Sequence, residues 1–212
     1  MTAVPATKSG RVARRRQQNL EALIAAGQEV MAEKGIDAAT MQEIADRADV
    51  GAGTVYSYFK SKEELAIAVL ERLMYSLALK IEKVTNTFDD PAQVYAFGIR
   101  TVIDTATGDV RWRQLLNRSE VIADAMFRQM GPFAIRDMEN ATKAGRFKVD
   151  NAPLTWKMAS YAIVGVALAV TNNTLSETVI DETVVRLLCM TGIGREEAID
   201  LASRHRPSLP QD

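Results

Sequence analysis

The chain has 212 residues, and the 47% that are hydrophobic suffice for a substantial core in one or two domains. Its net charge of −1 neither requires nor excludes a nucleic-acid partner. Its single cysteine, Cys189, excludes an internal disulfide and fits a reducing compartment. The basic N-terminus leads into an amphipathic stretch, which argues against a signal peptide, and the most apolar run, residues 158–170, is too short to span a bilayer.

Basic residues concentrate near the N-terminus. Residues 1–62 contain 9 Lys or Arg and 7 Asp or Glu, a net charge of +2, whereas residues 63–212 contain 17 and 20, a net charge of −3. The stretch 8–16 has no acidic residue and is either a solvated tail or an arm that contacts phosphates or the minor groove. We predict a disordered basic arm over residues 1–13, then a helix from Arg14 to Lys34 that Gly35 ends.

Residues 40–65 predict two short helices joined by a turn, followed by a third, capped helix. Thr40 and Glu43 form a capping box, and the apolar residues that follow recur at helical spacing. The turn falls at residues 49–51, where we expect Gly51 to adopt a backbone conformation that most residues resist. The next helix is expected over residues 52–58, and Ser61 begins a long helix. This pattern is typical of a helix-turn-helix.

The run from Val50 to Leu65, VGAGTVYSYFKSKEEL, with Thr-x-x-x-Ile-Ala upstream, resembles the N-terminal signature of the TetR family of bacterial transcriptional regulators. The resemblance covers about residues 14–70. It implies an all-α fold of about nine to ten helices, with a helix-turn-helix DNA-binding domain over residues 14–60. A helical effector-binding and dimerisation domain would follow over residues 61–206, with a frayed tail at 207–212.

The resemblance also implies which residues contact DNA. Thr40 would bind a phosphate, Gln42, Thr54 and Ser57 would face the major groove, and Tyr56, Tyr58 and Lys62 would hold phosphates. The small Ala52 and Gly53 leave little side chain for base contacts, so DNA shape or a thymine methyl would be recognised there. Arg14, Arg15 and Arg16 complete the predicted set. The alternative for the tyrosines is a place in the core, which we expect for Phe59.

The rest of the chain predicts helices and no strands. The expected helices cover residues 90–108, 111–116, 118–144, 153–175, 181–190 and 195–205, with a kink at Gly131-Pro132. The segment 156–174 is apolar nearly all round and needs cover on every side. We predict that a second copy covers it, and the alternative is a monomer with a buried central helix. The predicted dimer interface comprises Met158, Gly165, Leu168, Val184, Leu187 and Leu188.

Bulky aromatic and methionine side chains gather between residues 75 and 161. Each of these side chains, taken singly, is more typical of a core. Together, beside a kinked helix, they can leave a cavity. The resemblance implies that an apolar or amphipathic effector binds there. The predicted effector-binding residues are Trp112, Arg118, Glu120, Met126, Phe127, Met130, Phe133, Trp156 and Tyr161. For Arg118 and Glu120, a surface salt bridge is the alternative.

The sequence offers little for catalysis. Its only histidine, His205, lies near the C-terminus, and we find no metal-ligand spacing and no phosphate-binding glycine loop, so we predict neither enzyme activity, metal nor cofactor. We therefore predict a cytoplasmic, nucleoid-associated regulator with no membrane partner. As a homodimer it would bind an inverted-repeat operator in double-stranded DNA, as a repressor released by a small-molecule effector. The alternative is an activator or architectural protein without an effector.

Overall fold

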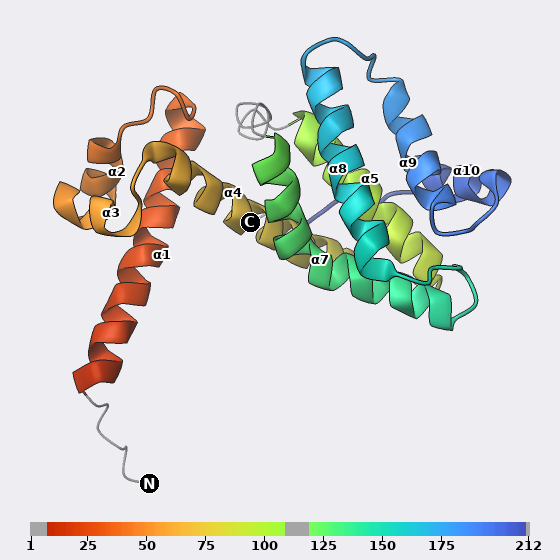
Figure 1. Ribbon diagram of the computed structural model, residues 1–212, viewed down its shortest axis with the longest axis horizontal. Coiled ribbons are helices and arrows are strands. Elements are labelled where there is room, and N and C mark those ends of the chain that lie inside the picture. The colour runs from red at the N-terminus through yellow and green to blue at the C-terminus, as the bar shows by residue number, and fades with distance from the viewer. Residues whose placement is uncertain (1–7, 109–118, 211–212) are drawn as a thin grey trace, which may run out of the picture. The chain divides into compact units, whose positions relative to one another are not determined.

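The computed structural model describes residues 8–108 and 119–210, and these form nine helices and no strand, as the all-α prediction requires (Figure 1). The helices are α1 (Lys8–Lys34), α2 (Met41–Arg47), α3 (Ala52–Tyr58), α4 (Lys62–Thr85), α5 (Pro91–Gly108), α7 (Ser119–Lys143), α8 (Ala152–Thr171), α9 (Val179–Cys189) and α10 (Arg195–Ser203). The short helix predicted at residues 111–116 lies outside the described residues.

The chain divides into two compact units, the first ending at Leu70 and the second beginning at Glu71. The boundary predicted at residue 60 is therefore too early, because the first turns of α4 belong to the N-terminal unit. The predicted disordered arm also changes, since α1 begins at Lys8 and not at Arg14. Residues 8–16 contain arginine, lysine and alanine, which favour helix, and no proline.

The core of the N-terminal unit forms where α1, α2, α3 and the first part of α4 pack together. Its fully buried side chains include Leu23, Ile44, Val55 and Leu65. A Cβ atom built at Gly27 would lie only 3.0 Å from the Leu65 Cδ2 atom, so the glycine allows α1 and α4 to approach closely. This packing holds α3 by its buried face and leaves the other face exposed.

The turn between α2 and α3 differs from the prediction. The residue with a left-handed backbone is Asp49, with φ 54°, whereas Gly51 has an ordinary φ of −67° and precedes the first turn of α3. Aspartate is one of the few residues that tolerate this conformation, because its short polar side chain bonds locally. At the other end of the motif, the predicted capping box of Thr40 and Glu43 is present.

In the C-terminal unit, α7 and α8 lie side by side, α5 packs against both, and α9 and α10 pack against α5 (Figure 1). Asp90 and Asn151 directly precede α5 and α8 and cap their first turns, since each side chain accepts a hydrogen bond of 3.0 Å from a main-chain N–H of the helix. The helix α7 continues through Pro132, and it changes direction along its length in Figure 1, in line with the predicted kink.

The helix α8 ends at Thr171, earlier than the predicted residue 175, because Asn173 takes a left-handed backbone with φ 55°. The sequence analysis underestimated the length of this apolar helix. By length and composition alone α8 could cross a membrane, since it has 20 residues and an 18-residue window of it has a mean hydropathy of 1.4. However, α8 packs against α5, α7 and α9, and the core helix of a soluble protein meets the same criterion.

Candidate functional site

The exposed face of α3 is the first candidate site. Val55 is fully buried and Phe59 is 5% exposed, so both belong to the core, as predicted for Phe59. Tyr56 is 57% exposed, which excludes the core alternative for this tyrosine. A Cβ atom built at Gly53 would meet no other atom within 4 Å, so the α3 backbone is open to close approach from outside.

None of the predicted DNA-contact residues is buried. Those exposed are Arg14, Arg15, Arg16, Thr40, Gln42, Gly53, Tyr56 and Ser57, and those half-buried are Ala52, Thr54, Tyr58 and Lys62. Two of the exposed polar ones already bond locally: Gln42 donates to Asp46 over 2.8 Å, and the Ser57 hydroxyl donates to the Thr54 carbonyl over 2.6 Å. Such exposed bonds can be exchanged for bonds to DNA at little cost.

Two of the predicted phosphate-binding residues also brace the motif. The Tyr58 hydroxyl donates a 3.1 Å hydrogen bond to the Arg16 carbonyl, and the Arg16 guanidinium lies 5.9 Å from the Tyr58 ring centroid. The Lys62 ammonium donates to the Asp37 carbonyl over 2.6 Å. Consequently, substitution of either side chain changes both the exposed surface and the contacts that hold α3 and α4.

Ion pairs hold α2 against α1. Arg47 contacts Glu29 at 3.1 Å and Glu33 at 3.0 Å, and its hydrogen bonds lower the pKa of Glu33. The Lys34 ammonium pairs with Glu43, and this bond, with that from the Thr40 hydroxyl, lowers the pKa of Glu43. These pairs position the helix that carries Gln42.

The sequence analysis did not single out Lys60, which is exposed between α3 and α4. The main-chain N–H of Lys60 donates to the Glu64 carboxylate over 2.6 Å, which fixes the backbone just before α4. The sequence could have indicated Lys60 as a further candidate for phosphate contact, because it lies two residues before Lys62.

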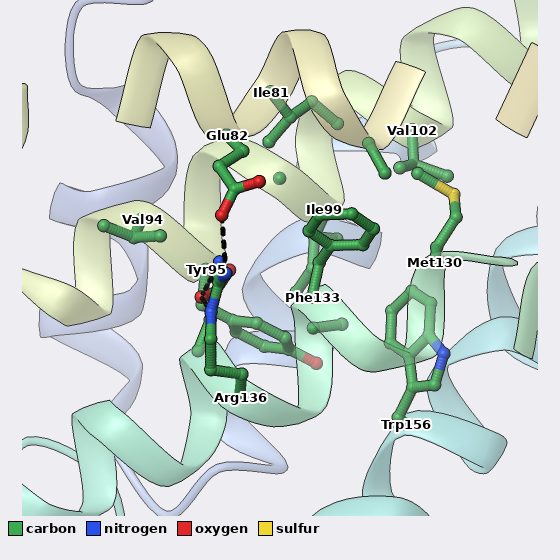
Figure 2. A pocket seen from close by; sticks show the side chains of 14 residues that line it. Ile81, Glu82, Val94, Tyr95, Ile99, Val102, Met130, Phe133, Arg136 and Trp156 are labelled. Carbon is green, nitrogen blue, oxygen red and sulfur yellow. Dashed lines mark hydrogen bonds and ion pairs between the residues drawn. The ribbon is translucent and has the colours of Figure 1, made fainter. Parts of the chain in front are cut away.

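The second candidate site is a cavity in the C-terminal unit, lined by α4, α5, α7 and α8 (Figure 2). Its enclosed volume is about 40 Å³, and the empty space rises to about 430 Å³ only when the part open to solvent is included. Most of the lining is apolar, including Ile81, Ile99, Val102, Met130, Phe133 and Trp156. Three of the predicted effector-binding residues, Met130, Phe133 and Trp156, therefore do line one cavity.

The other predicted effector residues lie elsewhere. Met126 is fully buried in the core, and Phe127 and Tyr161 are outside this cavity. Both rings instead flank Lys157, whose ammonium lies 4.9 Å from the Phe127 centroid and 5.1 Å from the Tyr161 centroid. Phe127 and Tyr161 lie on the outward side of α7 and α8 because the helical periodicity turns them away from the cavity. Trp112 and Arg118 lie outside the described residues, as does the side chain of Glu120.

The polar residues of the cavity were missed by the sequence analysis. Arg136 pairs with Glu82 at 2.5 Å and with Asp137 at 2.9 Å, and Tyr95 lies beside them (Figure 2). Burial raises the pKa of Asp137, although its hydrogen bond to Arg136 opposes the shift. No sequence spacing connects these residues, since they come from three helices.

The predicted dimer surface is corrected in part. Val184, Leu187 and Leu188 are buried within their own subunit, because α9 turns its apolar face toward the core, so they cannot meet a partner. Gly165 is exposed, Leu168 is half-buried, and Met158 is 55% exposed. The predicted interface residues on α8 therefore lie on a face that a second copy could reach.

Residues 23–69 match the family described as bacterial regulatory proteins, tetR family, and residues 90–204 match the tetracyclin repressor-like C-terminal domain. The second match alone spans more than half of the chain. The chain belongs to the TetR family. The predicted family and fold are therefore confirmed.

Several known TetR-family and related proteins are similar to the chain. It is 31% identical over 102 residues to the transcriptional activator FasR of Mycolicibacterium smegmatis, covering 48% of this chain and 47% of FasR. It is 30% identical over 111 residues to the transcriptional repressor KstR of Mycobacterium tuberculosis, covering 52% and 49%. The chain thus spans about half the length of the curated relatives that it matches. The solved structure of RolR with resorcinol aligns with a TM-score of 0.83 and 27% identity, over 93% of this chain and 100% of that chain.

Proposed function

We propose that this TetR-family protein is a transcriptional regulator that binds an inverted-repeat operator as a homodimer and changes its DNA affinity when a small molecule enters the C-terminal cavity. The observation that carries the proposal is the exposed face of α3, where the residues expected to contact DNA remain accessible while Val55 and Phe59 anchor the helix.

On DNA, α3 would lie in the major groove. Thr54 and Ser57 would reach base edges, while Tyr56, Lys62 and the exposed arginines of α1 would contact phosphates. The open backbone at Gly53 supports a close approach to the groove floor, so DNA shape would contribute to recognition.

A dimer would present two such helices. The exposed Met158 and Gly165 on α8 support a helix-to-helix interface, because a glycine allows a second backbone to come near. Two-fold symmetry would then place the recognition helices about 34–36 Å apart, on successive major grooves. The matching DNA site is an inverted repeat.

The helix α4 offers the connection between ligand and DNA. Its first turns belong to the N-terminal unit, and farther along Ala78, Ile81 and Glu82 line the cavity. A ligand that favours one position of α4 by about 2.7 kcal/mol would change operator affinity about a hundred-fold. The protein would act in the cytoplasm, on nucleoid DNA.

Repression with release by the effector is the first candidate, and activation is the second, because the relatives include both an activator and a repressor. RolR, which is 27% identical over nearly the whole chain, binds resorcinol, and this similarity favours a small effector. We propose no catalytic activity, in keeping with relatives that are transcriptional regulators.

The test is selection of duplexes from a random DNA pool by the purified full chain. We expect an inverted repeat to be enriched, with half-sites whose centres are about one helical turn apart or a small multiple of it. Enrichment of no sequence, or of a single half-site only, would contradict the proposal.

A further inference from the structure

Two ion pairs join α4 to α7 within the C-terminal unit. The Arg128 guanidinium donates a 2.6 Å hydrogen bond to the Glu71 carboxylate, and the Arg136 guanidinium donates a 2.5 Å hydrogen bond to the Glu82 carboxylate. Glu71 is the first residue of α4 that belongs to this unit, and Glu82 lies three residues before the end of the helix. The two ion pairs therefore bracket the part of α4 that belongs to the C-terminal unit.

A pair of aromatic rings adds a third contact between the same helices. The centroids of the Tyr75 and Phe133 rings lie 6.0 Å apart, and the Arg136 guanidinium lies 5.7 Å from the Phe133 centroid. Tyr75 lies four residues after Glu71 and seven before Glu82, so these three side chains share one face of α4. We call the two ion pairs and the ring pair the α4–α7 ladder.

One end of the ladder lies at the C-terminal cavity. Glu82, Phe133 and Arg136 line the cavity, whereas the ion pair of Glu71 and Arg128 lies outside its lining (Figure 2). The enclosed volume of about 40 Å³ is room for a few water molecules, while pockets for organic ligands occupy roughly 300–1,000 Å³. An organic molecule can therefore enter only if one of the lining helices moves outward.

Of the helices that line the cavity, α4 is the one that the ladder can release. The other three, α5, α7 and α8, pack directly against one another. Solvent reaches the side chains that hold the ladder, since those of Arg128 and Arg136 are 55% and 46% exposed. Ion pairs at such exposure contribute little to stability, so they open at a small cost. Separation of α4 from α7 thus leaves the packing among α5, α7 and α8 intact.

We propose that the α4–α7 ladder is a latch that holds α4 in its DNA-binding position, and that an effector acts by opening it. A molecule that enters beside Glu82 and Arg136 competes for their mutual bond and separates the two helices. Because α4 continues into the N-terminal unit, this separation changes the position of its first turns. The four charged residues of the ladder are therefore positioning residues for DNA binding. This assignment rests on the proposed function and names the contact that regulates it.

The test reverses the charge of both glutamates in the full chain. Glu71→Arg/Glu82→Arg turns both ion pairs into repulsions, and a dimer carries two ladders, so the released position of α4 becomes the favoured one. We expect the affinity for the duplex that the wild-type chain selects to fall at least tenfold in fluorescence anisotropy. Added positive charge by itself strengthens DNA binding, so it cannot cause this loss. Equal or tighter binding would overturn the latch.

Two control variants separate the latch from general effects of charge. Glu139→Arg/Glu177→Arg adds the same charge at two exposed glutamates outside the ladder, so we expect wild-type affinity or higher. Glu71→Arg/Arg128→Glu exchanges the charges of the first ion pair and preserves their attraction, so it should bind the duplex as the wild-type chain does. A tenfold loss of affinity in either control would overturn the assignment.

Glu71→Gln/Glu82→Gln decides the question if the reversed variant loses helix content in circular dichroism. It removes both charges without adding repulsion, so the chain should stay folded. We expect faster hydrogen exchange in residues 71–85 of α4 and unchanged exchange in α2 and α3. Exchange equal to that of the wild-type chain in residues 71–85 would overturn the latch. A wild-type chain that selects no duplex contradicts the proposed function, whereas selective wild-type binding with unaffected variants removes the latch alone.

Discussion

The Lys62 ammonium donates a 2.6 Å hydrogen bond to the main-chain oxygen of Asp37 and so ties the first turn of α4 to the loop between α1 and α2. A lysine ammonium has three N–H donors, so two remain for other acceptors. The same side chain therefore holds the motif together and, in the proposed complex, would also contact a phosphate.

Lys62→Ala should weaken binding to all duplexes by a similar factor, because a phosphate contact carries no sequence information. The slope of the logarithm of affinity against the logarithm of salt concentration should fall by about one. Fluorescence anisotropy at several salt concentrations measures both. Thr54→Ala and Gln42→Ala are the comparison, since these should relax preference at particular base pairs. Identical behaviour of all three variants would show that the roles are wrongly assigned.

Gly53→Ala should separate stability from DNA binding. The added methyl group meets no atom within 4 Å, and alanine is favoured over glycine in a helix, so the melting temperature should stay the same or rise slightly. If the α3 backbone approaches DNA closely here, operator affinity should fall at least tenfold. Unchanged affinity in a gel-shift assay would show that Gly53 does not face the DNA.

Gly165→Leu should weaken the dimer while the subunit stays folded. A Cβ atom at Gly165 meets nothing within 4 Å inside the subunit, so a larger side chain disturbs only an external partner. Analytical ultracentrifugation should give a dimer for the wild-type chain and a shift toward monomer for the variant. Ile199→Ala, at an exposed apolar residue of α10, should leave the dimer intact. A wild-type monomer would contradict the proposed assembly.

Asp90 links three parts of the C-terminal unit. Its carboxylate accepts 3.0 Å bonds from Arg146, from Arg204 and from the Ala92 N–H. Burial raises the pKa of Asp90, but these bonds together outweigh burial and lower the pKa below its ordinary 3.8. The stability that they contribute is thus present above pH 3.8 and is lost as the pH falls through the lowered pKa.

Asp90→Asn should therefore lower the free energy of unfolding at neutral pH by about 1–2 kcal/mol. The difference from the wild-type chain should shrink as the pH falls below 3.8, where the wild-type carboxylate also becomes neutral. Denaturant unfolding at several pH values measures this. Asp89→Asn, at an exposed neighbour, is the control. A stability difference that does not change with pH would contradict the assigned bonds.

The helix-turn-helix could be predicted because its information is local. Capping residues and apolar spacing act within one or two turns, so Thr40, Glu43 and Phe59 were assigned correctly from neighbours in the chain. The exception, Asp49 in place of Gly51, shows the limit of propensity, since both residues tolerate the left-handed region and only tertiary packing decides which one adopts it.

The cavity and the proposed dimer surface depend on packing between distant segments. Tyr95, Arg136 and Trp156 come from three helices, and no spacing along the chain indicates that they meet. For α9, the apolar face of Val184 and Leu188 fits a core or an interface equally well by periodicity. Only the arrangement of α9 against α5 and α10 places these side chains inside the subunit.

The most direct test of a regulator that binds DNA as a two-fold symmetric dimer is how its DNA affinity depends on the spacing of the half-sites. The duplex enriched by selection would be compared with one that has about five extra base pairs, half a helical turn, between its half-sites. The insertion turns one half-site to the opposite face of the DNA, so we expect affinity at physiological salt to fall about a hundred-fold or to the level of random duplex. Equal affinity for the two duplexes would contradict recognition by a rigid pair of α3 helices.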